Sequence, residues 1–297
     1  MAARTGSGTG VGERLPTTSS HAGILRPEEF ARYATLTRTA PGPEVAPWVE
    51  WCWSVTWDLP DGASYQSAVV PHPALHLTVE WGTGRRHGFP LPAALLHGIV
   101  TTRFDIGLRG TGGVAGVKFR PGGFGAFTGL DVATTLGSVV DLSEFFGSAA
   151  DALRANVIRA DADTRHDLLE AFLRVRVPGP DPRYDLVLDV VADMLADRSL
   201  TRVEQVTERH GIPLRTLQRL FRRYVGVGPK WALQRYRLHD AVALIDAGQV
   251  DDLSGLAASL GWYDQAHFTK EFTALVGLPP ARYAARHTDP SGQPAPS

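Results

Sequence analysis

Apolar residues follow two different periods in the two halves of the chain. Up to about residue 175, short runs rich in β-branched and aromatic residues alternate with Gly and Pro, as in 48–57 (WVEWCWSVTW), 67–82 and 112–124. Such runs predict strands joined by turns. Two stretches with helical spacing, near 142–157 and 163–175, end this half. After the stretch 174–184, whose prolines and glycine cannot continue a helix, apolar residues recur at spacings of three and four, which predicts helices.

These patterns predict an α+β protein of two domains. We expect a β-rich, barrel-like (cupin-like) domain with flanking helices over 25–177, a linker over 178–183, and an all-α domain over 184–287. The two ends, 1–24 and 288–297, are rich in small and polar residues and predict disordered tails.

The helical part contains the same plan twice. Read from Gly211 and from Gly261, four positions match at an offset of 51: Leu217 and Phe268, Phe221 and Phe272, Gly226 and Gly277, and Pro229 and Pro280. In each copy a short helix (202–209 and 253–260) meets a glycine-containing turn, and a second helix (214–225 and 264–276) ends at a Gly-x-(Gly/Pro)-Pro stop. This is the plan of a helix-turn-helix, in which the glycine allows the sharp bend.

Helical spacing assigns a buried and an exposed face to each second helix. In the first copy Leu217, Leu220, Phe221 and Tyr224 share the face that should pack inward. The opposite face carries four polar residues that we predict to contact DNA: Arg215, Gln218, Arg219 and Arg222. In the second copy the exposed residues predicted to contact DNA are Gln265, Thr269 and Lys270. Arg and Gln can bond guanine and adenine in the major groove, which admits a helix.

Charge is spread unevenly along the chain, although its formal net charge is only −1. The stretch 198–237 holds ten basic and two acidic residues, a net charge of +8. A local basic block is typical of phosphate binding, while a solvated helix face would also fit. Within this block we assign phosphate contacts to Arg202, Arg223, Lys230 and Arg235.

These residues carry a resemblance to a known family. RTLQRLFRRYVGVGPKW, the helix RYRLHDAVALI and LAASLGWYDQAHFTKEFTALVGLPPARY resemble the C-terminal domain of the AraC/XylS family of bacterial regulators, over about 100 residues. The resemblance implies that a helix over 230–247 joins the two units, so that both recognition helices enter successive major grooves. It also implies base contacts from Arg215, Gln218 and Arg219, and from Gln265, Ala266, Thr269 and Lys270.

The second unit departs from a strongly DNA-binding pattern. Its stretch 240–287 has six acidic and three basic residues, and Ala266 offers no hydrogen-bonding side chain. We therefore expect the second helix to read its groove weakly.

The N-terminal half resembles the domain that precedes this module in many actinobacterial-type AraC regulators. PHPALHLTVEWG and GVKFRPGGFGAFTG carry the resemblance. It implies a β-rich domain that senses a small molecule or mediates dimerisation, and it identifies no ligand.

Alternation places candidate chemistry on two strands. Over 72–81, His72, His76, Thr78 and Glu80 share one face. A His/His/Glu face could bind a metal, but hydrogen-bonded polar residues on a half-buried strand explain it better, so we expect no metal or cofactor. Tryptophans alternate onto one face over 51–57, which fits an apolar pocket or plain core. The predicted effector pocket comprises Trp51, Trp53, Trp57, His76 and Glu80.

Other classes of protein find little support. The single cysteine, Cys52, excludes an internal disulfide and a thiolate zinc cluster, and fits a reducing compartment. No run of 18 apolar residues predicts a membrane span, and the N-terminus lacks the apolar core of a signal peptide. The glycine-rich 109–116 fits a turn better than a dinucleotide site. We expect a cytoplasmic protein that is not an enzyme.

The sequence therefore predicts a sequence-specific DNA-binding transcription regulator that responds to a small-molecule effector. Its expected partners are double-stranded DNA, an effector, RNA polymerase if it activates, and a second copy if it dimerises. Two alternatives stay open: an enzyme in the β-rich half with an appended DNA anchor, and a DNA-binding protein whose front half only dimerises.

Overall fold

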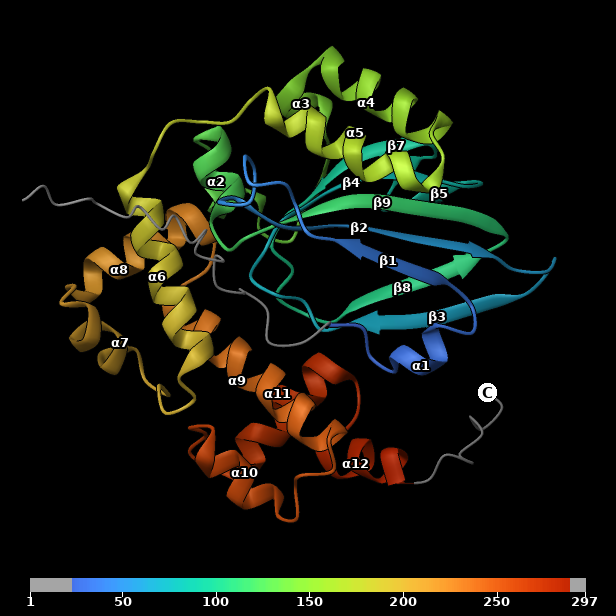
Figure 1. Ribbon diagram of the computed structural model, residues 1–297. Coiled ribbons are helices and arrows are strands. Elements are labelled where there is room, and N and C mark those ends of the chain that lie inside the picture. The colour runs from blue at the N-terminus through green and yellow to red at the C-terminus, as the bar shows by residue number, and fades with distance from the viewer. Residues whose placement is uncertain (1–22, 289–297) are drawn as a thin grey trace, which may run out of the picture.

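The structure is a computed structural model that describes residues 23–288 (Figure 1). The tails predicted over 1–24 and 288–297 therefore lie almost wholly outside the described residues. Gly23 and Ile24 belong to the fold, because Ile24 forms a β-bridge with Val69 and is buried. No helix within 23–288 is both long enough and apolar enough to cross a membrane.

The N-terminal half is built on an antiparallel sheet of six strands. In sheet order these are β1 (Thr35–Thr39), β2 (Val49–Asp58), β9 (Thr111–Phe119), β4 (His76–Trp81), β7 (Ala93–His97) and β10 (Val139–Asp141). Six of the ten residues of strand β2 are buried and three more are half-buried, because both faces of the sheet are covered. Cys52 packs into the core on one side, whereas Val55 and Trp57 belong to a second cluster on the other.

A separate ribbon of two strands faces this sheet. It pairs β3 (Ser64–Val69) with β8 (Phe104–Arg109), and the short helix α1 (Pro27–Phe30) lies beside it. The small hairpin of β5 (Arg85–Arg86) and β6 (Phe89–Pro90) follows β4. Since β1 and β10 are the free edges of the large sheet, the described strands form an open sheet over a ribbon. The expectation of a β-rich domain is confirmed, but the barrel does not close.

Helices cover the opposite face of the large sheet (Figure 1). After α2 (Gly123–Thr128), η1 (Val132–Thr135) and α3 (Ser143–Phe146), helices α4 (Ser148–Arg159) and α5 (Ala162–Arg174) contact β2, β4, β7 and β9. They match the two helical stretches predicted near 142–157 and 163–175. Their apolar stripes, including Leu153 and Leu169, enter the main core.

The C-terminal part is helical throughout, as expected. It contains α6 (Pro182–Ala196), α7 (Val203–His210), α8 (Leu214–Leu220) with the π-helical turn η2 (Phe221–Val225), α9 (Pro229–Asp246), α10 (Leu253–Ser259), α11 (Gln265–Val276) and α12 (Pro280–Thr288). Helices α7 with α8–η2 and α10 with α11 are the two helix-turn-helix units, and α9 joins them. The break between α5 and α6 coincides with the proline-rich stretch.

The two helix-turn-helix units belong to different cores. The first unit shares one continuous cluster of buried residues with the N-terminal sheet and helices, which includes Phe119, Phe124, Leu217 and Phe221. The second unit forms its own cluster around Phe268 and Phe272, reached from the N-terminal half by Leu25 and Val70. The first unit is therefore packed as part of the β-rich half, although the sequence pattern separates them.

Candidate DNA-binding surface and ligand cavity

Glycine sets the bend in both helix-turn-helix units. Gly211 follows α7 with φ 61°, and Gly261 follows α10 with φ 89°. Residues with a Cβ rarely adopt this left-handed region, so the turn needs glycine there. In the second unit Asp264 caps α11, because its carboxylate accepts a hydrogen bond from the His267 amide at 2.7 Å.

The second helix of the first unit has the two faces that its spacing predicts. Leu217, Leu220, Phe221 and Tyr224 are buried. The four residues predicted to contact DNA, Arg215, Gln218, Arg219 and Arg222, are all exposed. A row of exposed arginines on a short helix is the arrangement that can enter a major groove and bond bases or phosphates.

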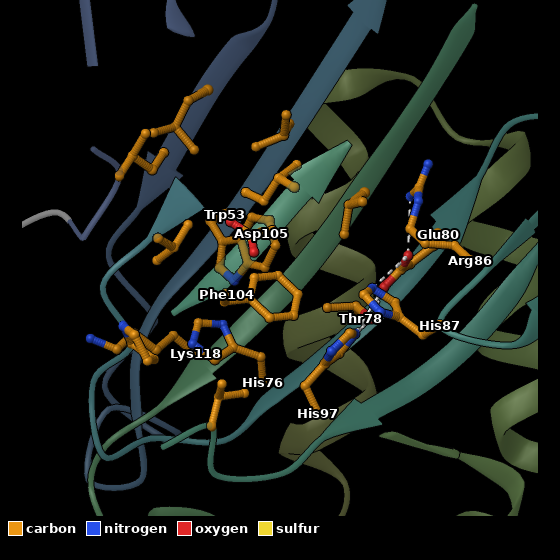
Figure 2. Close-up of a pocket in the computed structure, with 18 of the residues that line it drawn as sticks. Trp53, His76, Thr78, Glu80, Arg86, His87, His97, Phe104, Asp105 and Lys118 are labelled. Atoms are coloured by element: carbon orange, nitrogen blue, oxygen red, sulfur yellow. Dashed lines mark hydrogen bonds and ion pairs between the residues drawn. The ribbon is translucent and has the colours of Figure 1, made fainter. Parts of the chain in front are cut away.

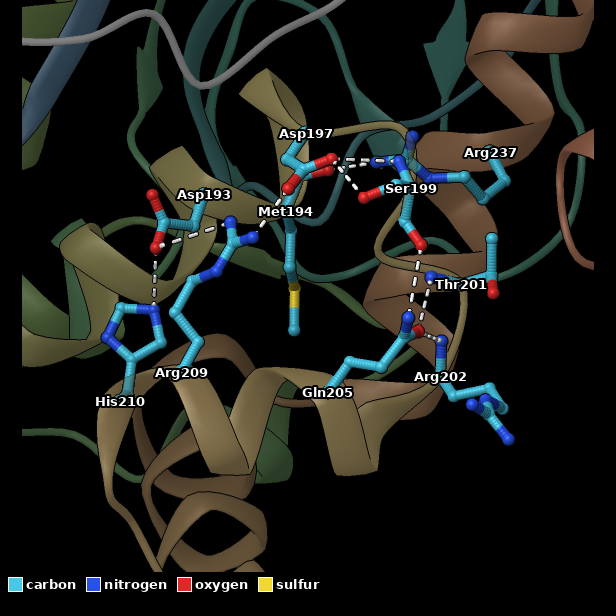
Figure 3. A network of polar contacts seen from close by, with 10 residues as sticks. All are labelled: Asp193, Met194, Asp197, Ser199, Thr201, Arg202, Gln205, Arg209, His210 and Arg237. Atoms are coloured by element: carbon cyan, nitrogen blue, oxygen red, sulfur yellow. Dashed lines mark hydrogen bonds and ion pairs between the residues drawn. The ribbon is translucent and has the colours of Figure 1, made fainter.

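Intramolecular contacts divide the basic stretch 198–237 into two sets. Five of its ten basic side chains are held within the protein: Arg198 by Asp240, Arg209 by Asp197, Arg223 by the Gly129 carbonyl, Arg235 by the Thr101 carbonyl, and Arg237 by Asp240. Figure 3 shows the part of this network around Arg209, whose guanidinium lies 2.5 Å from Asp197. The other five, Arg202, Arg215, Arg219, Arg222 and Lys230, are exposed and form no ion pair among the described residues. These five are the cations available to DNA.

Arg235 does not fit its expected role as a phosphate contact. Only 5 % of the residue is exposed, and its guanidinium donates to the Thr101 carbonyl oxygen at 2.5 Å and lies over the Trp231 ring. The sequence pattern could not reveal this, because the covering loop comes from the other half of the chain. Arg223 also bonds that half, at the Gly129 carbonyl, but it remains exposed.

The second unit presents fewer side chains that could contact DNA. Phe268, Phe272 and Leu275 are buried, as their spacing predicts. Of the residues predicted to contact DNA, Gln265 and Lys270 are exposed and Thr269 is half-buried. Gln265 already accepts a hydrogen bond from the Ser254 hydroxyl at 2.8 Å. A residue that sequence analysis did not single out, Tyr263, is 95 % exposed just before α11.

A cavity of about 290 Å³ lies between the large sheet and the β3–β8 ribbon. All five residues of the predicted effector pocket line it: Trp51, Trp53 and Trp57 from β2, and His76 and Glu80 from β4. His72 and Thr78 line it too, so the polar face predicted over 72–80 faces this cavity. Its volume is close to the lower end of the range for small-molecule sites.

One end of the cavity carries a polar cluster around Glu80 (Figure 2). The carboxylate lies 2.9 Å from His97 Nε2 and 3.0 Å from Arg86 Nη1, and His87 Nε2 lies 4.0 Å away. Burial alone would raise the pKa of Glu80, but the hydrogen bond from His97 and the charges of His97 and Arg86 lower it to about 2. Sequence analysis missed His87 and His97, because a hairpin turn and the fully buried strand β7 show no alternation that could mark them.

The other end carries a buried ion pair. Lys118 Nζ lies 2.9 Å from Glu50, both side chains are about 3 % exposed, and the ammonium lies over the Trp51 ring. Burial lowers the pKa of Lys118, and the charge of Glu50 opposes that shift. Beside this pair, burial and then the charge of Lys118 lower the pKa of His76 to about 3. His76 is thus a neutral side chain facing the cavity.

The neutral state of His76 predicts a pH dependence of stability. An unfolded histidine binds a proton below a pKa of about 6.5, whereas folded His76 does not until about pH 3. Stability should therefore fall as pH drops through 6.5 towards 3, by about 1–2 kcal/mol between pH 7 and pH 5. We expect His76→Gln to lose less stability than the wild type over this interval in urea titrations. Equal losses in both proteins would contradict the assignment.

Two family models match parts of the chain. Residues 37–141 match a domain of unknown function (DUF6597), and residues 206–286 match a helix-turn-helix domain. The second match begins within α7 and covers the rest of the first unit, the joining helix α9 and the second unit. No curated protein matches the chain.

Solved structures of ToxT from Vibrio cholerae match most of the chain, at low similarity. ToxT from strain O395 is 9% identical with a TM-score of 0.35, and the match covers 86% of this chain and 97% of that one. A second ToxT structure is 10% identical with a TM-score of 0.36, covering 89% and 98%. ToxT of strain SCE256 with a bound unsaturated fatty acid is 10% identical with a TM-score of 0.33, covering 89% and 95%.

Proposed function

We propose that a small molecule bound in the cavity of the β-rich half controls the affinity of this chain for DNA. The chain is a DNA-binding transcription regulator with an AraC-type helix-turn-helix domain. The observation that carries the proposal is a contact between the cavity and the DNA-binding part. His72 lines the cavity, and its ring stacks on that of His239 with centroids 4.0 Å apart and planes at 18°. His239 belongs to α9, the helix that joins both helix-turn-helix units.

A change at His72 would be transmitted to α9, because the surroundings are tightly packed. His239 is fully buried, and its Nε2 lies 3.4 Å from the Pro71 carbonyl oxygen. The neighbouring Val70 is buried in the core of the second unit. Packed interiors shift between discrete arrangements instead of deforming smoothly. A ligand that moves the 70–72 segment would therefore shift α9 and alter how the two units sit on DNA.

The cavity walls indicate the kind of molecule that would bind. Three tryptophans and several aliphatic side chains make most of the lining apolar and flat. The cluster around Glu80 supplies hydrogen-bonding groups at one end. We therefore expect a small, largely apolar molecule with one polar group.

The affinity for DNA should fall as the salt concentration rises. Only cations that are not already paired inside the protein should contribute to this dependence. Each phosphate contact adds about −0.9 to the slope of log K against log salt. Lys230→Ala removes an exposed cation that forms no ion pair within the part of the chain that the structure describes, so we expect the slope to become shallower by about 1. The measurement is fluorescence anisotropy of the full chain on duplex DNA between low and moderate salt.

Arg209→Ala is the matched control for this measurement. Its guanidinium is held by Asp197 and faces Asp193, so the substitution removes a cation that is already paired. Its slope should equal that of the wild type. The assignment of available cations fails if Arg209→Ala changes the slope as much as Lys230→Ala does.

A substitution that fills the cavity should abolish the response to ligand. Val55 lies between Trp53 and Trp57 on β2 and lines the cavity, so Val55→Trp occupies its space. A ligand present at about 100 times its Kd stabilises the folded chain by about 2.7 kcal/mol. We expect compounds from a panel of small aromatic and aliphatic acids, amines and alcohols to raise the wild-type Tm and to change its affinity for DNA, with both effects lost in Val55→Trp.

Val175→Trp provides the control for the added side chain. Val175 is 79 % exposed and lies outside the cavity, so its substitution should leave both responses intact. A compound that stabilises Val55→Trp as much as the wild type binds elsewhere, and this result would refute the cavity as the effector site.

A further inference from the structure

We propose that Glu80, His87 and His97 bind one divalent transition metal ion, zinc being the first candidate, with an open coordination position directed into the cavity. One ligand atom from each side chain can be chosen so that all three lie within 4.8 Å of one another. Figure 2 shows the three side chains converging at one end of the cavity. The proposal adds an inorganic site to the cavity and does not depend on an organic effector.

Three separate segments bring these ligands together. Glu80 lies on β4 and His97 on the neighbouring β7, where antiparallel pairing places both side chains on the cavity face. His87 and Gly88 form the two-residue turn of the β5–β6 hairpin, with φ of 50° and 85°. Positive φ at both positions is typical of the tight hairpin turn. This turn folds His87 back over Glu80, which no local sequence signal predicts.

The distances fit a small ion after modest adjustment. Zinc binds imidazole nitrogen and carboxylate oxygen at about 2.0–2.2 Å, so ligands in a tetrahedral site lie roughly 3.3 Å apart. His97 Nε2 lies 2.9 Å from Glu80 Oε1, and His87 Nε2 lies 4.0 Å from Glu80 Oε2. One separation is shorter and the other longer than this value. Small side-chain rotations would admit the ion.

The donor types suit metal binding. Glu80 offers a carboxylate oxygen, and His87 and His97 each offer an imidazole nitrogen. Two imidazoles and one carboxylate form a donor set that zinc uses when it keeps a further position open.

Neighbouring groups orient the ligands as outer-shell partners of a metal site do. Arg86 holds Glu80 Oε2 at 3.0 Å and stacks over Trp57, and the Thr78 hydroxyl donates to Glu80 Oε1 at 3.0 Å. Phe104 stacks on His87 and meets His97 edge-on, covering one side of the cluster. Hydrogen bonds of this kind to a ligating carboxylate support metal affinity. The position left towards the cavity would take water or a donor atom of a bound molecule.

The test uses the full chain, stripped of metal with a chelator and titrated with Co²⁺ as a spectroscopic probe and Zn²⁺ by calorimetry. We expect one ion per chain and visible Co²⁺ absorption bands. His97→Ala and His87→Ala should each weaken binding about tenfold or more. His87 lies in a partly exposed turn, so its variant should fold even if that of the buried His97 does not.

His267→Ala is the control, because His267 is an exposed histidine on α11 paired with Glu271. It should bind metal as the wild type does. Absence of Co²⁺ bands in the wild type, or equal metal affinity in His87→Ala and the wild type, would overturn the proposal. Neither readout involves an organic ligand. A chain that binds no metal would therefore leave the proposed effector site untouched. Conversely, the Val55→Trp comparison can fail while the chain still binds metal.

Discussion

Replacing Arg215, Arg219 and Arg222 together with alanine is expected to lower the affinity for a selected DNA site by about two to three orders of magnitude. All three are exposed on the second helix of the first unit and form no ion pair among residues 23–288. Each therefore meets DNA without first breaking a bond inside the protein. The measurement is anisotropy titration on a duplex that the wild-type chain selects from a random pool.

The paired substitution Thr269→Ala with Lys270→Ala is the matched change in the second unit, and we expect it to leave most of the affinity. Thr269 is half-buried, Gln265 is bonded to Ser254, and the stretch 240–287 is acidic overall. The selected DNA site should then contain one part with strong base preferences and one part with weak base preferences. Equal losses from both units, or two equally sensitive half-sites in operator scanning, would contradict this asymmetry.

Single substitutions should separate base reading from phosphate contact. Arg219→Ala is expected to relax preference at one or two base pairs, because an arginine in the groove bonds a particular base. Lys230→Ala should weaken all sequences alike, since this exposed cation lies at the start of α9, outside the helix predicted to read bases, and was assigned a phosphate contact. Selection with Arg219→Ala that returns the wild-type site would show that this residue does not read bases.

Phe221→Ala is expected to destabilise the β-rich half together with the first helix-turn-helix unit. Phe221 is fully buried in the cluster that also contains Phe119 and Phe124 of the N-terminal half. Truncating a buried phenylalanine costs about 3–5 kcal/mol. Because the cluster is continuous, hydrogen exchange of the slowest amides in β9 should accelerate about a hundredfold or more.

Phe272→Ala removes the equivalent side chain in the other repeat and serves as the comparison. Phe272 is as fully buried, but it belongs to the separate cluster of the second unit. Its substitution should accelerate exchange in α10 and α11 while leaving β9 close to the wild type. If Phe221→Ala leaves β9 unchanged, the shared core does not act as one cooperative unit.

Local patterns predicted most elements of this protein. The glycine turns at Gly211 and Gly261, the buried stripes on α8 and α11, and the joining helix α9 all lie within a few residues of their predicted positions. These features depend on helix periodicity and on the backbone freedom of glycine, which a single segment carries by itself. The same holds for β2 and β4, whose alternation placed Trp53, His76 and Glu80 on the cavity face.

Contacts between distant segments determined features that the alternation of polar and apolar residues along a strand does not predict. The sheet remains open and faces the β3–β8 ribbon, because strand pairing across distant segments is not encoded in the period of any one strand. For the same reason the burial of Arg235 under the Thr101 loop was not predicted. The convergence of His87 and His97 on Glu80 likewise required three segments to meet.

The sequence by itself determined that two helix-turn-helix units follow a β-rich half, since periodicity, turn glycines and a block of arginines are local properties of the chain. Only the tertiary structure decided which of those arginines are available to DNA. A basic residue in the sequence can contact DNA. Neighbours such as Asp197 or the Gly129 carbonyl determine whether its side chain is already held within the protein. The tertiary structure also decided that the first unit shares its core with the sheet, because apolar faces of separate elements bury one another wherever their shapes meet.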